Sequence, residues 1–321
     1  MSPKSRSPTT ARAVQNGDRR ALARLISQVE NRDPAVRPTL EALYPHTGHA
    51  RIVGLTGPLG VGKSSLINAL VNLLRHEGER VGVVAVDPSS PFSGGSVLGD
   101  RIRIERASGD DGVFVRSMAS RGHAGGVAAA TCEVARLLDA AGYGVILVET
   151  VGSGQVDLEI RGIATTSVVV LVPHLGDEVQ TLKAGLFEIA DVFCVNKSDL
   201  PGAEEAAKDL RELVGLGPPR GGWRPAVVTT TALGGTGVAD LWRAVDAHEG
   251  FLDESGTRHE VERRRAREEI LGLVRERLDG DLSARIERDP EVQALIDRVA
   301  EHSMDPRAAA DHLYRSLRRS R

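Results

Sequence analysis

The sequence predicts an α/β protein built on a doubly wound, mostly parallel sheet, with helical segments before and after it. Short apolar runs typical of strands alternate with helical patterns between residues 51 and 250. A glycine-rich loop joins the first of these runs to the first helix. Beyond residue 250 no strand-like run occurs. We therefore expect an N-terminal helical extension over 1–50, a nucleotide-binding domain over 51–250 and a C-terminal helical arm over 251–321.

The expected strands are continuously apolar, which is typical of a parallel sheet covered on both faces. Their ranges are 52–56, 81–86, 113–116, 145–149, 168–172, 192–196 and 227–231. A helix with leucines along one face follows the glycine-rich loop, and further helical patterns cover 127–141, 178–189, 204–214 and 238–247.

Helices are also expected at both ends of the chain. Leu22, Leu25, Ile26 and Val29 recur at helical spacing and predict an N-terminal helix that stops near residue 32. The C-terminal patterns cover 258–278, 291–301 and 306–317. The first of them is charged with a thin apolar stripe, and such a stripe requires a second surface to cover it. We expect this arm to form dimer or partner contacts.

Composition excludes several classes of protein. The 321 residues carry a formal net charge of −3, which argues against a dedicated nucleic-acid binder. No apolar run is long enough for a membrane-spanning helix, and the basic start lacks the apolar core of a secretory signal. Cys132 and Cys194 offer neither a disulfide framework nor a zinc site. A reducing, cytoplasmic setting is the expectation.

The glycine-rich loop has the spacing of a phosphate-binding P-loop, Gly57-Pro-Leu-Gly-Val-Gly-Lys-Ser64. In such loops backbone N–H groups and the following helix N-terminus surround the phosphates. Lys63 is expected to reach the β- and γ-phosphates, and the Ser64 hydroxyl to bind Mg²⁺. The expected nucleotide contacts are Gly57, Leu59, Gly60, Val61, Gly62, Lys63, Ser64 and Ser65.

A second string, Asn196-Lys-Ser-Asp199, follows an apolar strand at the edge where α/β sheets bind their ligands. The Asp199 carboxylate can accept hydrogen bonds from guanine N1 and N2, which adenine does not supply. Asn196 is expected to brace the phosphate loop, and the stem of Lys197 to cover the base. After the next strand, a backbone N–H of Thr231, Ala232 or Leu233 can approach guanine O6. The predicted ligand is GTP or GDP.

Three carboxylates are expected near the phosphates. Asp87, Asp100 and Glu149 each follow or end a strand-like run or lie in a glycine-rich loop, and they could hold Mg²⁺ through water or orient the attacking water. Gln155, in the glycine-containing loop with Gly152 and Gly154, is a further candidate for orienting water. Charged and polar residues in another loop suggest a switch that reports nucleotide state, namely Asp177, Glu178, Gln180 and Lys183.

These strings together resemble the MeaB-type GTPases, also called ArgK-type, the family of the human methylmalonic aciduria type A protein. The resemblance covers nearly the whole chain and includes Asp87-Pro-Ser-Ser-Pro, Gly94-Gly-Ser-Val-Leu-Gly-Asp-Arg101, Glu149-Thr-Val-Gly and Gly176-Asp-Glu. It implies a chaperone that uses GTP to gate cofactor loading of an adenosylcobalamin-dependent acyl-CoA mutase, such as methylmalonyl-CoA mutase, and to protect it. It also implies homodimers formed through the C-terminal helices, and a third switch loop containing Asp177 and Lys183.

The chain departs from the family pattern in three loops. Leu59 stands where the family usually has proline, Ser153 lies in an altered loop after Glu149, and His174-Leu175 replaces a Gly-Ala pair. These changes bear on which mutase is served and how it is coupled.

Two other functions remain open from the residues. One is a GTP-dependent small-molecule kinase with Asp87 as base, and the other is a scaffold that holds nucleotide without turnover. A nickel-insertion GTPase is disfavoured because the sequence has no His/Cys cluster. No arginine finger is identifiable, so we expect slow hydrolysis without a partner.

Overall fold

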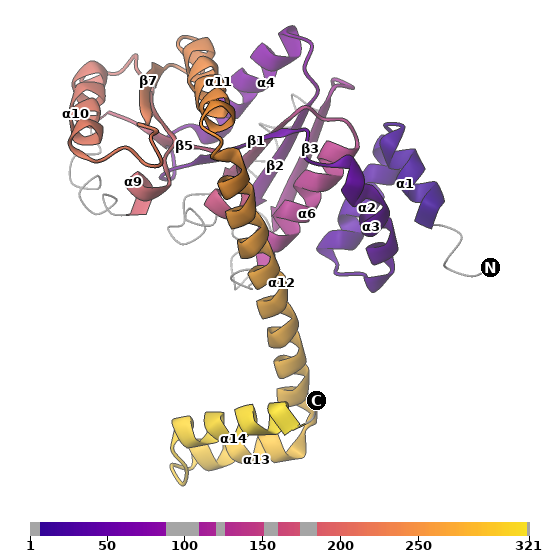
Figure 1. The fold of residues 1–321 in the computed structure, drawn as a ribbon. Coiled ribbons are helices and arrows are strands. Elements are labelled where there is room, and N and C mark those ends of the chain that lie inside the picture. The colour runs from indigo at the N-terminus through magenta and orange to yellow at the C-terminus, as the bar shows by residue number, and fades with distance from the viewer. Residues whose placement is uncertain (1–6, 88–108, 120–125, 151–159, 174–184, 320–321) are drawn as a thin grey trace. The chain divides into compact units, whose positions relative to one another are not determined.

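A computed structural model of the chain describes residues 7–87, 109–119, 126–150, 160–173 and 185–319. Its centre is a seven-stranded sheet in the order β3-β2-β4-β1-β5-β6-β7 (Figure 1). Every pair of neighbouring strands is parallel, which confirms the predicted fold class. The strands are β1 Arg51–Thr56, β2 Val81–Asp87, β3 Val113–Ala119, β4 Val145–Thr150, β5 Thr166–Leu171, β6 Val192–Asn196 and β7 Ala226–Thr230.

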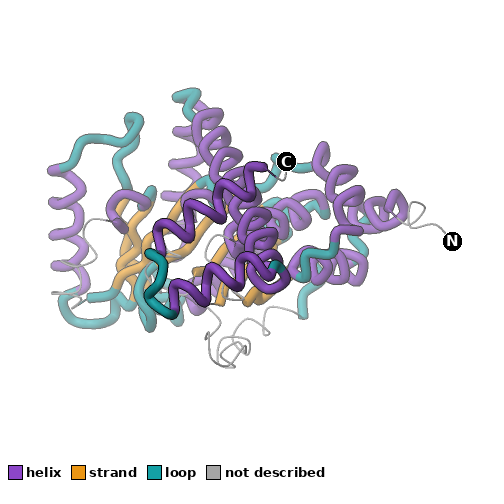
Figure 2. The backbone as a smooth tube through the Cα atoms, turned by 90° about the horizontal axis from the view of Figure 1, so that it is seen from below, coloured by secondary structure: helices purple, strands orange, loops and turns teal. Residues whose placement is uncertain are grey.

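Helices cover both faces of this sheet because successive strand side chains point to opposite faces. Val81 and Val83 of β2 belong to a core that α4 (Lys63–His76) and α11 (Val238–Glu254) cover, whereas Val84 and Val86 belong to a second core. The second core includes residues of α6 (Gly126–Ala140), α9 (Gly185–Ile189) and α10 (Ala203–Leu216). Figure 2 shows the strands in orange and the helices in purple.

Three N-terminal helices pack beside α6: α1 (Ser7–Gln15), α2 (Arg19–Glu30) and α3 (Arg37–Leu43). The expected helix is α2, whose leucines are buried. It begins where the Asp18 carboxylate accepts hydrogen bonds from two backbone N–H groups. It ends before Arg32, which adopts a φ of 56°. The sequence analysis did not predict α1 and α3.

The C-terminal helices are α12 (Arg258–Arg288), α13 (Pro290–Ala300) and α14 (Pro306–Arg319). α12 is one uninterrupted helix of 31 residues and extends beyond the expected end at residue 278. It stops where Pro290 follows Asp289, because a proline ring clashes with a preceding helical turn. An exposed apolar stripe lies along it, at Ile270, Leu273, Val274 and Leu278.

The chain divides into two compact units, Met1–Glu269 and Ile270–Arg321. The three-part division at residues 50 and 250 remains a prediction. Among the described residues, no helix is both long enough and apolar enough to cross a membrane.

Candidate functional site

The phosphate loop leaves the carboxyl end of β1 and requires glycine at two positions. Gly57 has a φ of 136°, and a Cβ there would lie 2.1 Å from the carbonyl oxygen of Val170. Gly62 has a φ of 93°, and a Cβ there would lie 2.5 Å from Asn196 Nδ2. Both φ values are in the region that favours glycine, and neither position has room for a side chain. The backbone of the loop therefore lies directly against β5 and β6.

Lys63 lies over this loop at the start of α4. Its side chain is buried, and Nζ donates hydrogen bonds to the carbonyl oxygens of Gly57 at 2.6 Å and Pro58 at 2.9 Å. The N-cap residue of α4 is Gly62, which has no side chain to accept from the first N–H groups of the helix. A helix N-terminus of this kind attracts anions, and the ammonium adds a positive charge beside it.

Ser64 and Glu149 form a buried, hydrogen-bonded pair. Ser64 Oγ donates to Glu149 Oε1 over 2.6 Å, and the residues are 8% and 6% exposed. The pair forms because β4 lies beside β1, with Glu149 opposite Leu55. A second link at this edge joins Thr150 Oγ1 to Thr56 Oγ1 at 2.8 Å. A hydroxyl next to a carboxylate suits a hard cation such as Mg²⁺, which binds oxygen ligands.

Asn196 joins three segments of the site. Its side chain is 2% exposed, and Nδ2 donates to the carbonyl oxygen of Val61 at 2.8 Å. Oδ1 accepts from the backbone N–H of Ala232 and from Thr230 Oγ1, both at 3.1 Å. One amide thus holds the phosphate loop, the end of β6 and the segment after β7 in a single arrangement.

The neighbours of Asn196 extend this arrangement. Lys197 has a φ of 57°, and its Nζ donates to the carbonyl oxygen of Gly60 at 2.8 Å, so its stem crosses toward the phosphate loop. Ser198 Oγ lies 2.9 Å from Thr231 Oγ1. Asp199 is exposed in the turn after β6, where its carboxylate is free to face solvent or a base.

The comparisons with known proteins agree with this geometry. The family model described as methylmalonyl-CoA mutase-associated GTPase MeaB matches residues 22–287. A putative GTPase of Pyrococcus abyssi is 48% identical over 307 residues, which are 95% of this chain and 94% of that protein. The mitochondrial methylmalonic aciduria type A homolog of Mus musculus is 32% identical over 270 residues, 83% of this chain and 65% of that protein.

This chain belongs to the MeaB family of P-loop GTPases. Among solved structures, the crystal structure of a LAO/AO transport system kinase has a TM-score of 0.74 and 26% identity, and the match covers 98% of both chains. The predicted family is confirmed.

In this MeaB-family chain the structure brings together ten of the residues expected from the sequence. The contacts described above link these residues, directly or through their backbone: Gly57, Gly60, Val61, Gly62, Lys63, Ser64, Glu149, Asn196, Lys197 and Ala232. Ser65 follows Ser64 in the first turn of α4. Leu59 and Leu233 are 73% and 93% exposed and make the edge of the site apolar. Their roles toward a nucleotide remain predictions.

Other expected residues are less completely described. Asp87 is the last residue of β2, so its backbone reaches the same edge of the sheet. The remaining predicted residues lie outside the described part of the chain: Asp100, Ser153, Gln155, His174, Leu175, Asp177, Glu178, Gln180 and Lys183.

Thr230 contributes to this arrangement but was not predicted from the sequence. This residue is completely buried, and its hydroxyl hydrogen-bonds Asn196 and also lies 3.1 Å from Cys194 Sγ. Burial raises the pKa of the Cys194 thiol to about 12, so the thiol is neutral. The only sequence signal for Thr230 is its place immediately before the predicted guanine segment.

Proposed function

We propose that this MeaB-family protein binds and hydrolyses GTP with Mg²⁺, and that it acts as a chaperone for an adenosylcobalamin-dependent acyl-CoA mutase. In this role it gates cofactor loading and protects the mutase, which is methylmalonyl-CoA mutase or a relative. Support comes from the family's description and from the name of the mouse relative. We place this activity in the cytoplasm.

The observation that carries the guanine assignment is the placement of Asn196. Its amide links the phosphate loop to the Ala232 N–H, so the phosphate and base regions of the site are held together. A guanine between Lys197 and the segment 231–233 would bring its N1 and N2 groups toward Asp199. Charge-assisted hydrogen bonds of this kind each contribute about 1.5–3 kcal/mol, so ATP would bind at least about a hundredfold more weakly.

The chain's own groups account for the chemistry at the phosphate end. Lys63 would exchange the carbonyl oxygens of Gly57 and Pro58 for β- and γ-phosphate oxygens. The oxygens of Ser64 and Glu149 would hold Mg²⁺, directly or through water, and the ion would neutralise charge on the phosphates. We assign Asp87, Asp100 and Gln155 to the metal's water shell or to the attacking water.

The C-terminal helices supply the surface for association. The stripe on α12, at Ile270, Leu273, Val274 and Leu278, is 40–60% exposed. Its spacing matches one face of a helix, and a second helix would remove it from water. We propose a homodimer formed through these helices. The charged and polar switch residues Asp177, Glu178, Gln180 and Lys183 would respond to the mutase.

A pair of assays tests the function. First, the purified protein is given GTP or ATP with Mg²⁺, and phosphate release is followed. We expect slow hydrolysis of GTP and almost none of ATP. Second, purified methylmalonyl-CoA mutase is loaded with adenosylcobalamin with and without this protein, with Lys63→Ala as the variant unable to bind GTP. The expected result is GTP-dependent loading that the variant does not support.

Four outcomes would contradict the proposal. Equal hydrolysis of ATP would refute the guanine assignment. Transfer of the γ-phosphate to a metabolite would establish the kinase alternative, and GTP persisting for hours with the mutase present would establish the scaffold. Loading unaffected by this protein for every cobalamin mutase tried would refute the chaperone role.

A further inference from the structure

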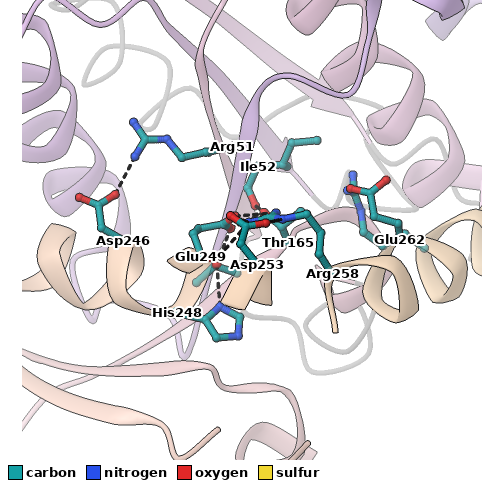
Figure 3. Close-up of polar contacts among 11 residues, drawn as sticks. Arg51, Ile52, Thr165, Asp246, His248, Glu249, Asp253, Arg258 and Glu262 are labelled. Atoms are coloured by element: carbon teal, nitrogen blue, oxygen red, sulfur yellow. Dashed lines mark hydrogen bonds and ion pairs between the residues drawn. The ribbon is translucent and has the colours of Figure 1, made fainter. Parts of the chain in front are cut away.

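A second group of buried polar side chains lies at the amino end of β5, opposite the edge that carries the phosphate loop. Thr165, Thr166, His248 and Glu249 are each 6% exposed or less. Figure 3 shows Glu249, Thr165, Asp253 and Arg258 gathered in one cluster. The six residues of β5 span about 20 Å, so these groups cannot touch a bound nucleotide.

Glu249 binds two elements through one carboxylate. Its Oε1 accepts from Thr165 Oγ1 at 2.6 Å and from Thr166 Oγ1 at 2.7 Å, at the start of β5. Its Oε2 accepts from Arg258 Nη1 at 2.9 Å. Arg258 is the first residue of α12, and it also donates to the backbone carbonyl of Glu249 at 2.9 Å and pairs with Asp253. Asp253 and Glu249 raise the pKa of Arg258.

This arrangement attaches the start of α12 to both the end of α11 and the start of β5. A buried carboxylate costs free energy unless it is paired, and here each oxygen has a donor. Removing the Arg258 charge would leave the Glu249 carboxylate with only the two threonine hydroxyls as side-chain donors.

α12 has a second point of contact about ten residues later. A Cβ on Gly162 would lie 3.4 Å from Glu268 Cβ, so the two backbones approach closely. The next residue, Glu269, accepts a hydrogen bond from Arg136 Nη1 of α6 at 2.8 Å. α12 is therefore joined to the segment 160–166 at two places: Glu268 lies against Gly162, and Arg258 is linked to Thr165 and Thr166 through Glu249.

The segment 160–166 is in turn packed on the strands that carry the nucleotide site. Ile160 lies so close to β1 that a Cβ on Gly54 would be 2.3 Å from its Cγ1. The backbone N–H of Thr165 donates to the carbonyl oxygen of Ile52, also in β1, at 2.8 Å. β1 leads directly into the phosphate loop, and β5 pairs with it. Close-packed interiors transmit displacement because they have little free volume.

We propose that the segment 160–166 carries the nucleotide state to α12, and that the Glu249–Arg258 pair and the Gly162–Glu268 contact are its two points of attachment. The inference rests on the proposed function, because it requires a chain that alternates between GTP and GDP. It assigns Gly162, Glu249 and Arg258 as positioning residues that touch neither nucleotide nor metal.

Hydrogen–deuterium exchange of the full chain tests this inference. The chain is measured with GDP and with a non-hydrolysable GTP analogue, and exchange in residues 258–269 is compared. In the unaltered protein the two states should differ in this region. Glu249→Gln removes the charge at one attachment, and Gly162→Val forces α12 away at the other. In both variants the nucleotide-dependent difference should disappear, and exchange there should become about tenfold faster.

The affinity for a fluorescent guanine nucleotide should stay within about twofold in these variants, because none of the altered residues touches the nucleotide. Glu41→Gln is the matched control, since it breaks the exposed Arg37–Glu41 pair of α3, whose atoms are 3.0 Å apart. Arg258→Lys keeps the charge but loses the guanidinium that bonds Glu249 and Asp253 together, and this variant replaces Glu249→Gln in the test if Glu249→Gln does not fold.

Two results would overturn the inference: no nucleotide-dependent difference in the unaltered chain, or a difference that survives at both altered attachments. Failure to bind guanine nucleotide at all would instead refute the proposed function and is detected separately by the affinity measurement.

Discussion

Replacing Thr230 with valine tests how the guanine region is held. Valine keeps the shape of the buried side chain but removes the hydroxyl that donates to Asn196 Oδ1. Oδ1 retains the Ala232 N–H, so it is not left without a partner. A neutral hydrogen bond contributes about 1 kcal/mol net, and we expect GTP affinity to fall about fivefold. Asn196→Ala removes three hydrogen bonds, about 3 kcal/mol, and should weaken binding more than about a hundredfold.

The measurement is a fluorescence titration with a labelled guanine nucleotide, repeated with ATP as competitor. Thr229→Val is the matched control, since Thr229 is the neighbouring residue of β7 and only half-buried. Unchanged affinity in Thr230→Val, or an equal loss in Thr229→Val, would refute the view that Thr230 positions the Asn196 amide.

Three further predictions concern single residues. Lys63→Arg keeps the charge but replaces a slim ammonium side chain with a broad guanidinium that the buried loop does not accommodate. Isothermal titration should show that GTP binding is largely lost, and normal binding would contradict the P-loop role. Asp199→Asn should let ATP compete with GTP, and retained discrimination in a competition assay would remove Asp199 from base recognition. Burial lowers the pKa of His248 below its ordinary 6.5. Protonation of His248 therefore favours the unfolded chain, and the free energy of unfolding should fall as pH drops from 7 to 5. Urea unfolding of His248→Gln should show a shallower pH dependence, and an identical one would refute this cause.

Much of the sheet was predictable because most strands can be recognised from a short stretch of sequence. The central strands are buried on both faces, so they appear as continuous apolar runs, as in β4 and β6. The end of α12 was harder to predict. Half of residues 279–288 are charged and only Leu282 and Ile286 are large and apolar, yet the helix continues through them until Asp289-Pro290. Neither α1 nor α3 was predicted, because both are short and their burial depends on neighbours distant in sequence.

The phosphate loop and Asn196 were predictable for a different reason. Their function requires backbone conformations and side chains at fixed spacing, so Gly57, Gly62 and Lys63 form a recognisable string. The pairing of Ser64 with Glu149 was only partly visible, because 85 residues separate them and β1 must lie beside β4 to bring them together.

Thr230 and Glu249 had no such string. A threonine near the end of a strand and a glutamate in a helix are common, and each gains its role only from the partners that the fold supplies. Glu249 of α11 links β5 to α12, because β5 starts beside α11 and Arg258 begins the next helix. The residues that touch the nucleotide are constrained by the ligand's chemistry, which many proteins share. The residues that would link the nucleotide to α12 are constrained by this fold alone, so they can be found from the structure and not from a motif.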